Sequence, residues 1–380
     1  MSDVETIPSF DLKRNYARVG DEIKDALDRV LSSTQFVMGP EVASFEKEAA
    51  GYLGSRRAVA VASGTDALLL ALMALGVKPG DEVITTPFSF FATVSCITRL
   101  GAKPVFADVE PDSYNISMER VREAITPMTK VFIPVHLFGQ MCRLEEIMGE
   151  LEAKNIALAE DCAQAFGAHR ARCGAIVRAG TWGDFGCFSF FPTKNLGAYG
   201  DAGMVTCDSD ELGGRVAMLR LHGSASSYLH EEVGINSRMD ALQAAILRVR
   251  LRHIETWTEE RREAARRYSL LFAERGLREH IVPPSVAEGN RHTYHQYVIR
   301  ASRRDDLQKF LSAKGVMTRV YYPLPLHLQP CFAYLGHEKG AFPVSEKLSE
   351  EVLALPMFPE ITEGEQEKVV CCIAEFYKIA

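Results

Sequence analysis

The sequence predicts an α/β protein whose first two-thirds form a mostly parallel β-sheet and whose remainder forms a smaller α+β region. Apolar runs rich in β-branched residues alternate with helical stretches through the first part of the chain. Near-continuous apolar strands of this kind are typical of parallel sheets that helices cover on both faces. A long, charge-dense helical stretch over 240–275 then precedes shorter strands and helices.

Seven apolar runs are the predicted strands of the large sheet. They cover residues 58–62, 82–86, 104–108, 130–136, 157–161, 186–190 and 203–207. Helices are predicted between them over 65–76, 89–100, 116–125 and 143–153. Because crossover connections are right-handed, the loops at the carboxyl ends of these strands are expected to form the binding site.

The stretch over 240–275 predicts a helical spine between two domains, with its charges on a solvated face. After it the sequence predicts a strand over 295–300, a helix over 304–314, a strand over 318–323 and a closing helix near 363–378. We therefore expect a large domain over residues 1–245 and a small C-terminal domain over 246–380.

Composition and charge exclude several classes of protein. The chain has 380 residues, 47% of them apolar, and a net charge of −7, so it is neither disordered nor surrounded by a field that attracts nucleic acid. No apolar run approaches the roughly 18 residues of a membrane span, and no secretory signal is visible. Nine scattered cysteines without a CxxC pair predict free thiols in a reducing compartment and no metal site. A cytoplasmic protein that binds neither nucleic acid nor membrane is expected.

A turn of small residues follows the first predicted strand. Ser63, Gly64, Thr65 and Asp66 open the next helix, and the N–H groups at a helix start can bind a phosphate. The alternative is ordinary capping of that helix by Ser63 or Thr65.

An acidic residue, Asp161, ends the apolar run over 157–161, and Gln164 follows it. Burying a carboxylate is costly unless it is paired or hydrogen-bonded. Asp161 either caps the next turn or faces a cationic ring nitrogen, which would lower the pKa of the carboxyl and keep the ring protonated.

A lysine, Lys194, follows the aromatic run over 186–190 and precedes Gly197, Gly200 and Gly203. Most lysines face solvent. The glycines, however, let the backbone approach a neighbour closely, and an apolar setting lowers the pKa of a lysine. A lysine with a lowered pKa is the residue that forms Schiff bases with carbonyl compounds.

Three aromatic residues, Phe88, Phe90 and Phe91, follow the second predicted strand. One interpretation is that all three pack in the core. The alternative is that one of them stacks on a flat cofactor ring. A phosphate-binding turn, an acid for a ring nitrogen, a lysine and a stacking ring are together the parts that a pyridoxal phosphate enzyme needs. Lys194 lies 33 residues after Asp161 with one strand between them, so both can reach one cleft.

Ordered sequence segments occur along nearly the whole chain. They are FDLKRNY (10–16), QFVMGPEVASFE (35–46), SGTDALLLAL (63–72), GDEVITTPFSFFAT (80–93), PVHLFGQ (134–140), EDCAQAFGA (160–168), SFFPTKNLGAYGDAG (189–203), GINSRMDALQAAIL (234–247) and YYPLPLHLQP (321–330). Together they resemble the DegT/StrS family of nucleotide-sugar aminotransferases. The resemblance implies the fold type I architecture of pyridoxal phosphate-dependent transferases: a large domain with a mostly parallel seven-stranded sheet flanked by helices, and a smaller C-terminal α+β domain.

The resemblance also implies roles for individual residues. Lys194 would form the Schiff base with pyridoxal 5′-phosphate and later move protons, while Asp161 would pair with the ring nitrogen. Gln164 would lie near the hydroxyl side of the cofactor, and Phe90 would cover the ring face. The phosphate would be bound by Gly64, Thr65 and Ser189.

Other roles implied by the resemblance involve a second subunit and the substrate. A homodimer with shared sites is implied, in which Asn236 reaches the phosphate and Arg238 lies in the same segment. His327 would contact the sugar nucleotide; the alternative is a hydrogen-bonded histidine near a turn.

The resemblance narrows the reaction as well. Lysine rather than histidine at position 194 favours transamination over dehydration, with glutamate as amino donor. The strings FPTKNLGAYGDAG and NSRMDALQAAIL resemble members that aminate carbon 3 of a keto sugar. Candidate substrates are a UDP-linked 2-acetamido-3-keto uronic acid, which is slightly favoured, and a dTDP-linked 3-keto-6-deoxyhexose. A carbon-4 aminotransferase, a sugar dehydratase and a non-catalytic regulator of the same fold stay open, and the stretch over 170–184 has no assigned role.

Overall fold

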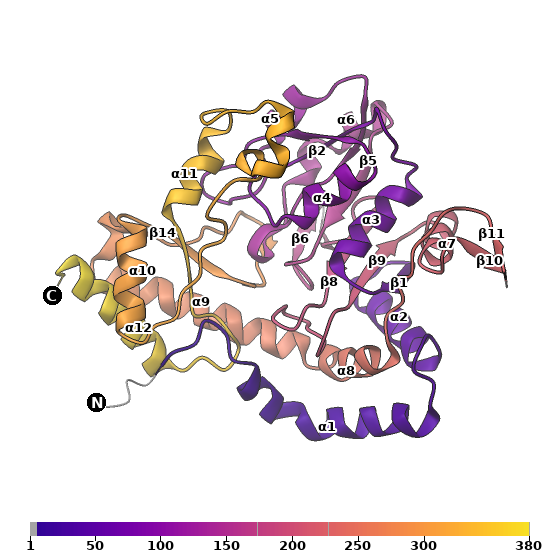
Figure 1. The fold of residues 1–380 in the computed structure, drawn as a ribbon. Helices are drawn as coiled ribbons and strands as arrows, with labels where there is room; N and C mark the ends of the chain where they lie inside the picture. Colours follow the sequence, from indigo (N-terminus) through magenta and orange to yellow (C-terminus); the bar gives the residue numbers. More distant parts are fainter. Residues whose placement is uncertain (1–5, 173, 227, 380) are drawn as a thin grey trace.

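A seven-stranded sheet with the strand order β1-β9-β8-β5-β4-β2-β3 forms the centre of the fold in the computed structural model, which describes residues 6–172, 174–226 and 228–379 (Figure 1). Its strands are β1 (Arg57–Val61), β2 (Glu82–Thr85), β3 (Lys103–Phe106), β4 (Thr129–Phe132), β5 (Ala157–Asp161), β8 (Phe185–Ser189) and β9 (Gly203–Cys207). All pairings are parallel except those of β9, which is antiparallel to β1 and β8. All seven predicted strands are therefore confirmed.

Helices cover both faces of this sheet, as expected for a parallel sheet. The helices of this region are α2 (Pro40–Leu53), α3 (Gly64–Ala74), α4 (Ala92–Arg99), α5 (Met118–Ala124), α6 (Met148–Ala153), α7 (Asp210–Leu219) and α8 (Ala241–Leu251). Neighbouring strand residues face opposite layers: Cys187 packs with α3 and α7, whereas Phe188 packs with α2 and α8. The alternation along β8 thus places one helical layer on each face.

The C-terminal region contains a second, three-stranded sheet of β12 (Ile281–Val282), β14 (Tyr297–Ala301) and β15 (Val352–Leu355), with the order β12-β14-β15. Its helices are α9 (Ile254–Glu274), α10 (Arg304–Ala313), α11 (Pro343–Glu351) and α12 (Glu363–Tyr377). The strand predicted over 318–323 is wrong. Only Arg319 forms a bridge, to Ala354, because the chain then turns away from the sheet. The strand that pairs with β14 on its other side is β15, which was not predicted from the sequence.

The N-terminal helix α1 (Leu12–Ser33) lies along α8, and the two helices share a small apolar core (Figure 1). Upstream of α1, Ile7 bridges Val316 and belongs to the C-terminal core. The predicted boundary between residues 245 and 246 falls inside α8, so the division into two domains stays a prediction.

The stretch over 170–184 contains most of a hairpin of β6 (His169–Arg172) and β7 (Ala175–Arg178), to which β13 (Asn290–Arg291) adds a third strand. A two-stranded ribbon consists of β10 (Ser224–Ser226) and β11 (Leu229–His230). Short 3-10 turns lie at Leu137–Gly139, Leu144–Glu146, Leu277–Glu279, Leu326–Leu328 and Pro330–Leu335. No helix within the described ranges combines the length and the apolar character that crossing a bilayer requires.

Candidate active site

A cavity of about 440 Å³ lies at the carboxyl ends of the strands of the large sheet, where the topology predicts a site. Its size is within the range of small-molecule sites. Seven of the predicted site residues line it: Gly64, Thr65, Phe90, Asp161, Gln164, Ser189 and Lys194. The structure therefore brings together residues from four strand ends that are far apart in the sequence.

Asp161 ends β5 with its carboxylate at the wall of the cavity and only 4% of the residue exposed. Its Oδ2 accepts a hydrogen bond from Thr93 Oγ1 (2.8 Å), and its Oδ1 accepts one from Ala163 N (3.1 Å). Burial raises the pKa of this carboxyl, although both hydrogen bonds and the charge of Lys194 oppose the rise. The carboxylate can therefore accept a further, cationic N–H group.

Lys194 lies in the turn after β8, with its backbone N–H donating to Phe191 O (2.8 Å). Removal from water lowers the pKa of its amine to about 8, while the charge of Asp161 acts in the opposite direction. With this pKa roughly a tenth of the amine is uncharged at pH 7, far more than for an ordinary lysine, and the uncharged form is the one that acts as a nucleophile or proton acceptor.

The turn before α3 forms a cradle of backbone at one side of the cavity. Ser63 caps the helix by accepting a hydrogen bond from Asp66 N (3.1 Å), so the capping alternative is correct for Ser63. A Cβ atom on Gly64 would lie 2.5 Å from Cβ of Ser189, and one on Gly203 would lie 2.3 Å from the Ser63 backbone. Glycine is thus required at both positions. The first-turn N–H groups, which lack partners within the helix, suit an anion such as phosphate.

Gln164 connects the cavity to the C-terminal region. Its Oε1 accepts a hydrogen bond from Phe138 N (2.8 Å), and its Nε2 donates to the hydroxyl of Tyr322 (2.9 Å). Tyr321 and Tyr322 both line the cavity, yet the sequence reading assigned a role only to His327 of the same segment. Thr93 was also missed, because a single threonine inside a helix gives no signal in the sequence.

The three aromatic residues after β2 have different surroundings. Phe88 is fully buried in the core, and Phe91 stacks on Phe332 with ring centroids 5.4 Å apart. Phe90 lines the cavity with 60% of its surface exposed, so it is the residue of the three that can cover a bound ring.

His327 does not lie in the cavity, contrary to the role implied for it. The imidazole is 1% exposed, its Nε2 lies 3.1 Å from Oε1 of Glu346, and the rings of Phe106 and Phe342 surround it. These contacts hold the side chain in the interior, as the alternative of a hydrogen-bonded histidine near a turn expects.

Asn236 and Arg238 also lie outside the cavity of their own chain. Ser237, between them, donates to Asp66 (2.7 Å) and accepts from Ala62 N (3.1 Å), which fixes the segment beside the start of α3. Asn236 is exposed there and Arg238 is half-buried. Neither position contradicts a role in the site of a second subunit.

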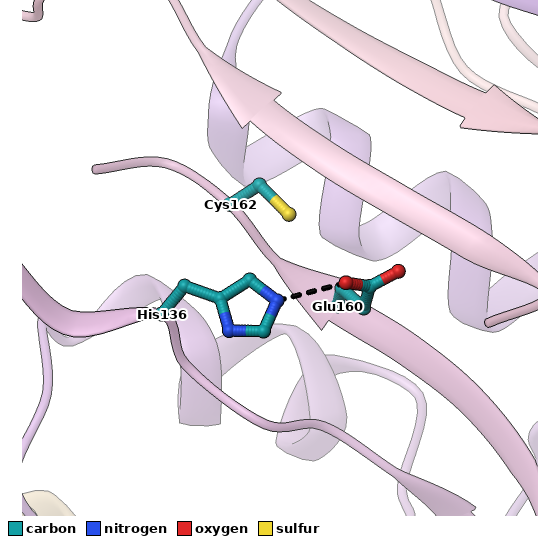
Figure 2. A group of neighbouring side chains, drawn as sticks. All are labelled: His136, Glu160 and Cys162. Carbon is teal, nitrogen blue, oxygen red and sulfur yellow. Dashed lines mark hydrogen bonds and ion pairs between the residues drawn. The ribbon is translucent and has the colours of Figure 1, made fainter. Parts of the chain in front are cut away.

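Within the described residues, one group of three potential metal ligands lies close together: His136, Glu160 and Cys162, all buried (Figure 2). Glu160 already accepts four hydrogen bonds, one from His136 Nε2 (Figure 2) and three from the backbone N–H groups of residues 180, 182 and 183. The other nitrogen of His136, Nδ1, accepts from Cys142 N (3.1 Å). Glu160 and both nitrogens of His136 thus have hydrogen-bond partners within the protein, and the bonds to Glu160 attach the segment over 180–183 to β5.

The donor set of the cavity fits pyridoxal phosphate part by part. The start of α3 and Ser189 fit the phosphate, and the carboxylate of Asp161 fits the protonated ring nitrogen. The amine of Lys194 fits the aldehyde, and the exposed ring of Phe90 fits one face of the pyridine.

Comparison with known proteins agrees with this fit. The family model described as the DegT/DnrJ/EryC1/StrS aminotransferase family matches residues 17–374. A pleiotropic regulatory protein of Geobacillus stearothermophilus is 46% identical over 98% of this chain and 99% of its own length. A UDP-N-acetyl-3-dehydro-alpha-D-glucosamine 3-aminotransferase of Acidithiobacillus ferrooxidans is 40% identical over 98% of each chain. The crystal structure of S. venezuelae DesV in complex with a ketimine intermediate superimposes with a TM-score of 0.94, 36% identity and 99% coverage of both chains.

These matches confirm the resemblance and the fold class that the sequence predicts. Solved relatives of the same fold hold the cofactor as pyridoxal phosphate or pyridoxamine phosphate. The chain belongs to the DegT/DnrJ/EryC1/StrS aminotransferase family and is a pyridoxal phosphate-dependent aminotransferase.

Proposed function

We propose that the enzyme transfers the amino group of glutamate to carbon 3 of a nucleotide-linked keto sugar. The observation that carries this proposal is the presence of Lys194 and Asp161 in one cavity, an amine with a lowered pKa opposite a buried carboxylate. The choice of carbon 3 is supported by the name of the A. ferrooxidans relative, which matches this chain over nearly its full length.

Lys194 is the residue that moves protons in this mechanism. Pyridoxal phosphate, when bound, would supply an aldehyde carbon that accepts the amino group and a protonated ring that withdraws electrons. Nζ of Lys194 removes the proton from the α-carbon of glutamate and, in the second half of the reaction, delivers a proton to carbon 3 of the sugar. A pKa of about 8 suits both steps, because the amine can exist in either form near neutral pH.

Asp161 keeps the ring nitrogen protonated by placing a permanent negative charge beside it. Thr93 and the backbone of Ala163 each donate one hydrogen bond to it, which fixes the direction of the carboxylate. Gln164 and Tyr322 form a rigid polar wall, because the amide of Gln164 is held at both ends.

A homodimer with shared sites is part of the proposal. Phe90, Phe91 and Phe191 expose 44–60% of their surfaces near the cavity, and exposed apolar side chains grouped in this way mark interaction surfaces. A second chain that covers them would bring its own Asn236 and Arg238 toward the phosphate and the substrate. Sedimentation equilibrium should give twice the chain mass.

We also propose that the enzyme works in the cytoplasm, in the biosynthesis of an amino sugar destined for a polysaccharide. The cysteines that the structure describes are all free, and five of the eight lie in the core of the large sheet region. Free buried thiols are typical of a reducing compartment.

A regulatory protein of the same fold is the alternative suggested by the name of the G. stearothermophilus relative. A regulator without catalysis would not need a lysine amine and a buried carboxylate in one cavity, and this chain has both. The carbon-4 alternative is not favoured, because the names of the A. ferrooxidans relative and of a Pseudomonas aeruginosa relative specify amination at carbon 3. The dehydratase alternative is not favoured, because this chain has Lys194 where dehydratases of the family are expected to have a histidine.

The first experiment is the absorbance spectrum of the purified holoenzyme before and after addition of glutamate. A shift of the visible band to the near-ultraviolet band of the aminated cofactor is expected, and the aminated enzyme should then convert a UDP- or dTDP-linked 3-keto sugar to a 3-amino sugar seen by mass spectrometry. Lys194→Ala should abolish both steps, whereas Lys154→Ala, at an exposed position, should retain them. A wild-type band that ignores glutamate would contradict the donor, and a band that never forms would favour the regulator.

A further inference from the structure

A histidine from the C-terminal region lies in the wall of the cavity, although no motif in the sequence pointed to it. His295 precedes β14, is 6% exposed and lines the same cavity as Lys194. Lys194 lies 101 positions earlier in the sequence. His295 contacts Asn195, the residue that follows Lys194.

The hydrogen bonds around His295 define which of its ring nitrogens carries the proton. Asn195 donates from Nδ2 to Thr293 O (3.0 Å), so its Oδ1 is the atom that lies 3.2 Å from Nδ1 of His295. A carbonyl oxygen only accepts, so Nδ1 of His295 must be the donor. Burial and the nearby charges of Lys194 and Arg261 lower the pKa of His295 well below its ordinary value. The ring is therefore neutral, with a lone pair on Nε2.

The side chain of His295 is not needed to hold its own segment. Two backbone hydrogen bonds already do so: Thr293 N donates to Gly139 O (2.9 Å), and His295 N donates to Phe138 O (2.9 Å). What the imidazole adds is the bond to Asn195, the residue next to Lys194 in the turn after β8. Asn195 is itself buried, so loss of this bond would leave its carbonyl oxygen without a donor.

We propose that His295 is a positioning residue for Lys194: through its hydrogen bond to Asn195, it fixes the turn from which the lysine amine enters the cavity. The proposal rests on the proposed role of Lys194 as the residue that moves the proton. If the amine of Lys194 is displaced by about one ångström, the rate of proton transfer falls, whereas the groups that bind glutamate and the sugar keep their positions. His295 should therefore affect kcat and leave KM nearly unchanged.

Three substitutions separate this role from a merely structural one. His295→Asn places an amide N–H near the position of Nδ1 and keeps the donor to Asn195. His295→Gln places its amide near the position of Nε2 and loses that donor, and His295→Phe keeps the ring volume without any donor. His292→Phe is the matched control, because His292 is as deeply buried and accepts from Tyr294 N (2.9 Å) but does not line the cavity.

The readouts are kcat, KM for glutamate, the melting temperature and the visible circular dichroism of the resting holoenzyme, which reports the orientation of the cofactor. We expect His295→Phe and His295→Gln to lower kcat by about tenfold to a hundredfold with KM changed by less than about threefold, and to weaken the visible dichroism. His295→Asn should restore both. His292→Phe should lower the melting temperature and leave kcat and the dichroism unchanged.

A double-substitution cycle tests the route through Asn195. In an Asn195→Ala background, His295→Phe should cause no further loss of kcat. The proposal is wrong if His295→Phe keeps the wild-type kcat, if His295→Gln restores activity and His295→Asn does not, or if the two losses add. A wild-type enzyme that does not respond to glutamate would instead contradict the proposed function. In that case the visible circular dichroism of the resting holoenzyme would still test the effect of His295 on the orientation of the cofactor.

Discussion

Replacing Glu160 with glutamine tests how firmly the fold fixes the strand end that carries Asp161. The carboxylate of Glu160 is fully buried and accepts two hydrogen bonds at each oxygen. Oε1 accepts from Trp182 N (2.8 Å) and Gly183 N (3.1 Å), and Oε2 accepts from Gly180 N (3.0 Å) and His136 Nε2 (2.8 Å). Glutamine keeps one oxygen and replaces the other by NH₂, so two N–H groups lose their acceptor whichever way the amide is turned.

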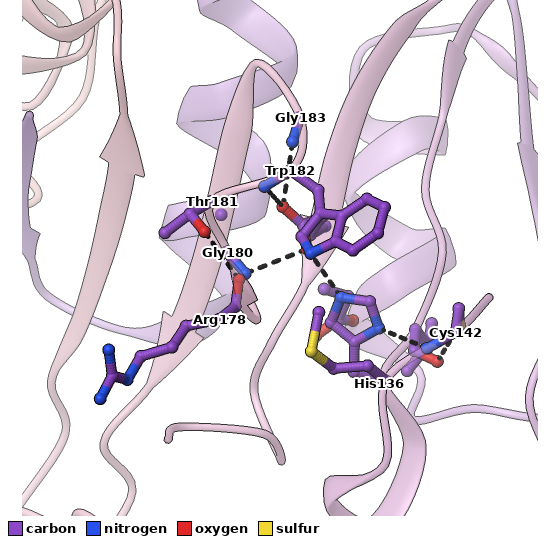
Figure 3. A network of polar contacts seen from close by, with 12 residues as sticks. His136, Cys142, Arg178, Gly180, Thr181, Trp182 and Gly183 are labelled. Carbon is purple, nitrogen blue, oxygen red and sulfur yellow. Dashed lines mark hydrogen bonds and ion pairs between the residues drawn. The ribbon is translucent and has the colours of Figure 1, made fainter. Parts of the chain in front are cut away.

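Histidine 136 cannot repair the loss by moving its proton. An acceptor at Nε2 would require the proton on Nδ1, but Nδ1 of His136 faces the N–H of Cys142 at 3.1 Å (Figure 3). Each buried donor left without an acceptor costs about 1–3 kcal/mol. Two such donors give about 2–6 kcal/mol, and we expect Glu160→Gln to lower the free energy of unfolding by about 4 kcal/mol.

The assay is urea denaturation of the holoenzyme followed by far-ultraviolet circular dichroism, with Glu152→Gln as the matched control. Glu152 is exposed, and its substitution should change the free energy of unfolding by less than about 0.5 kcal/mol. A loss below about 1 kcal/mol for Glu160→Gln would refute the reasoning, since it would mean that the two orphaned N–H groups find other acceptors.

Four further predictions follow from the site and its buried histidines. Gly64→Ala should weaken binding of pyridoxal phosphate to the apoenzyme, measured by fluorescence titration, because the added Cβ would lie 2.5 Å from Cβ of Ser189; wild-type affinity would contradict the cradle. Asp161→Asn should lower kcat by about a hundredfold without unfolding the chain, and near-normal turnover would exclude its role. The rate constant for binding of pyridoxal phosphate to the apoenzyme should rise up to about pH 8, where the free amine of Lys194 loses its proton, and a flat profile from pH 6.5 to 9 would argue against the lowered pKa of this amine. Burial lowers the pKa of His292 from 6.5 to about 3, so the unfolded state binds more protons and stability falls as the pH drops below 6.5. This histidine alone should account for about 1 kcal/mol between pH 7 and 5.5, and His292→Phe should remove that part of the acid dependence seen in urea titrations.

The large sheet and its cavity could be predicted because they depend on local patterns and on topology. Each of the seven strands is a short apolar run, and parallel strands place their carboxyl ends at one edge. Asp161 is the last residue of β5 and Lys194 follows the end of β8, so their meeting in one cavity is a consequence of the pairing of β5 with β8.

The C-terminal region was harder to predict, because its elements depend on contacts between distant residues. The run over 318–323 has the composition of a strand, but only Arg319 pairs, and Tyr321 and Tyr322 turn into the cavity. His327 follows in the same segment, and the sequence alone does not show that Glu346 holds it in the interior. The bond between His295 and Asn195 is equally invisible, since no spacing rule links positions 100 residues apart.

Two adjacent carboxylates on β5 illustrate how the same chemical group is used for structure and for function. Successive residues of a strand point to opposite faces, so Glu160 faces the core while Asp161 faces the cavity. An ionised carboxylate offers about four acceptor positions. Glu160 fills all four with N–H groups of the protein, whereas Asp161 receives one hydroxyl and one backbone N–H. The saturated carboxylate can only hold the fold, and the unsaturated one, raised in pKa by its burial, gains most from a cation that enters the cavity. The count of donors, more than the depth of burial, therefore distinguishes the two residues.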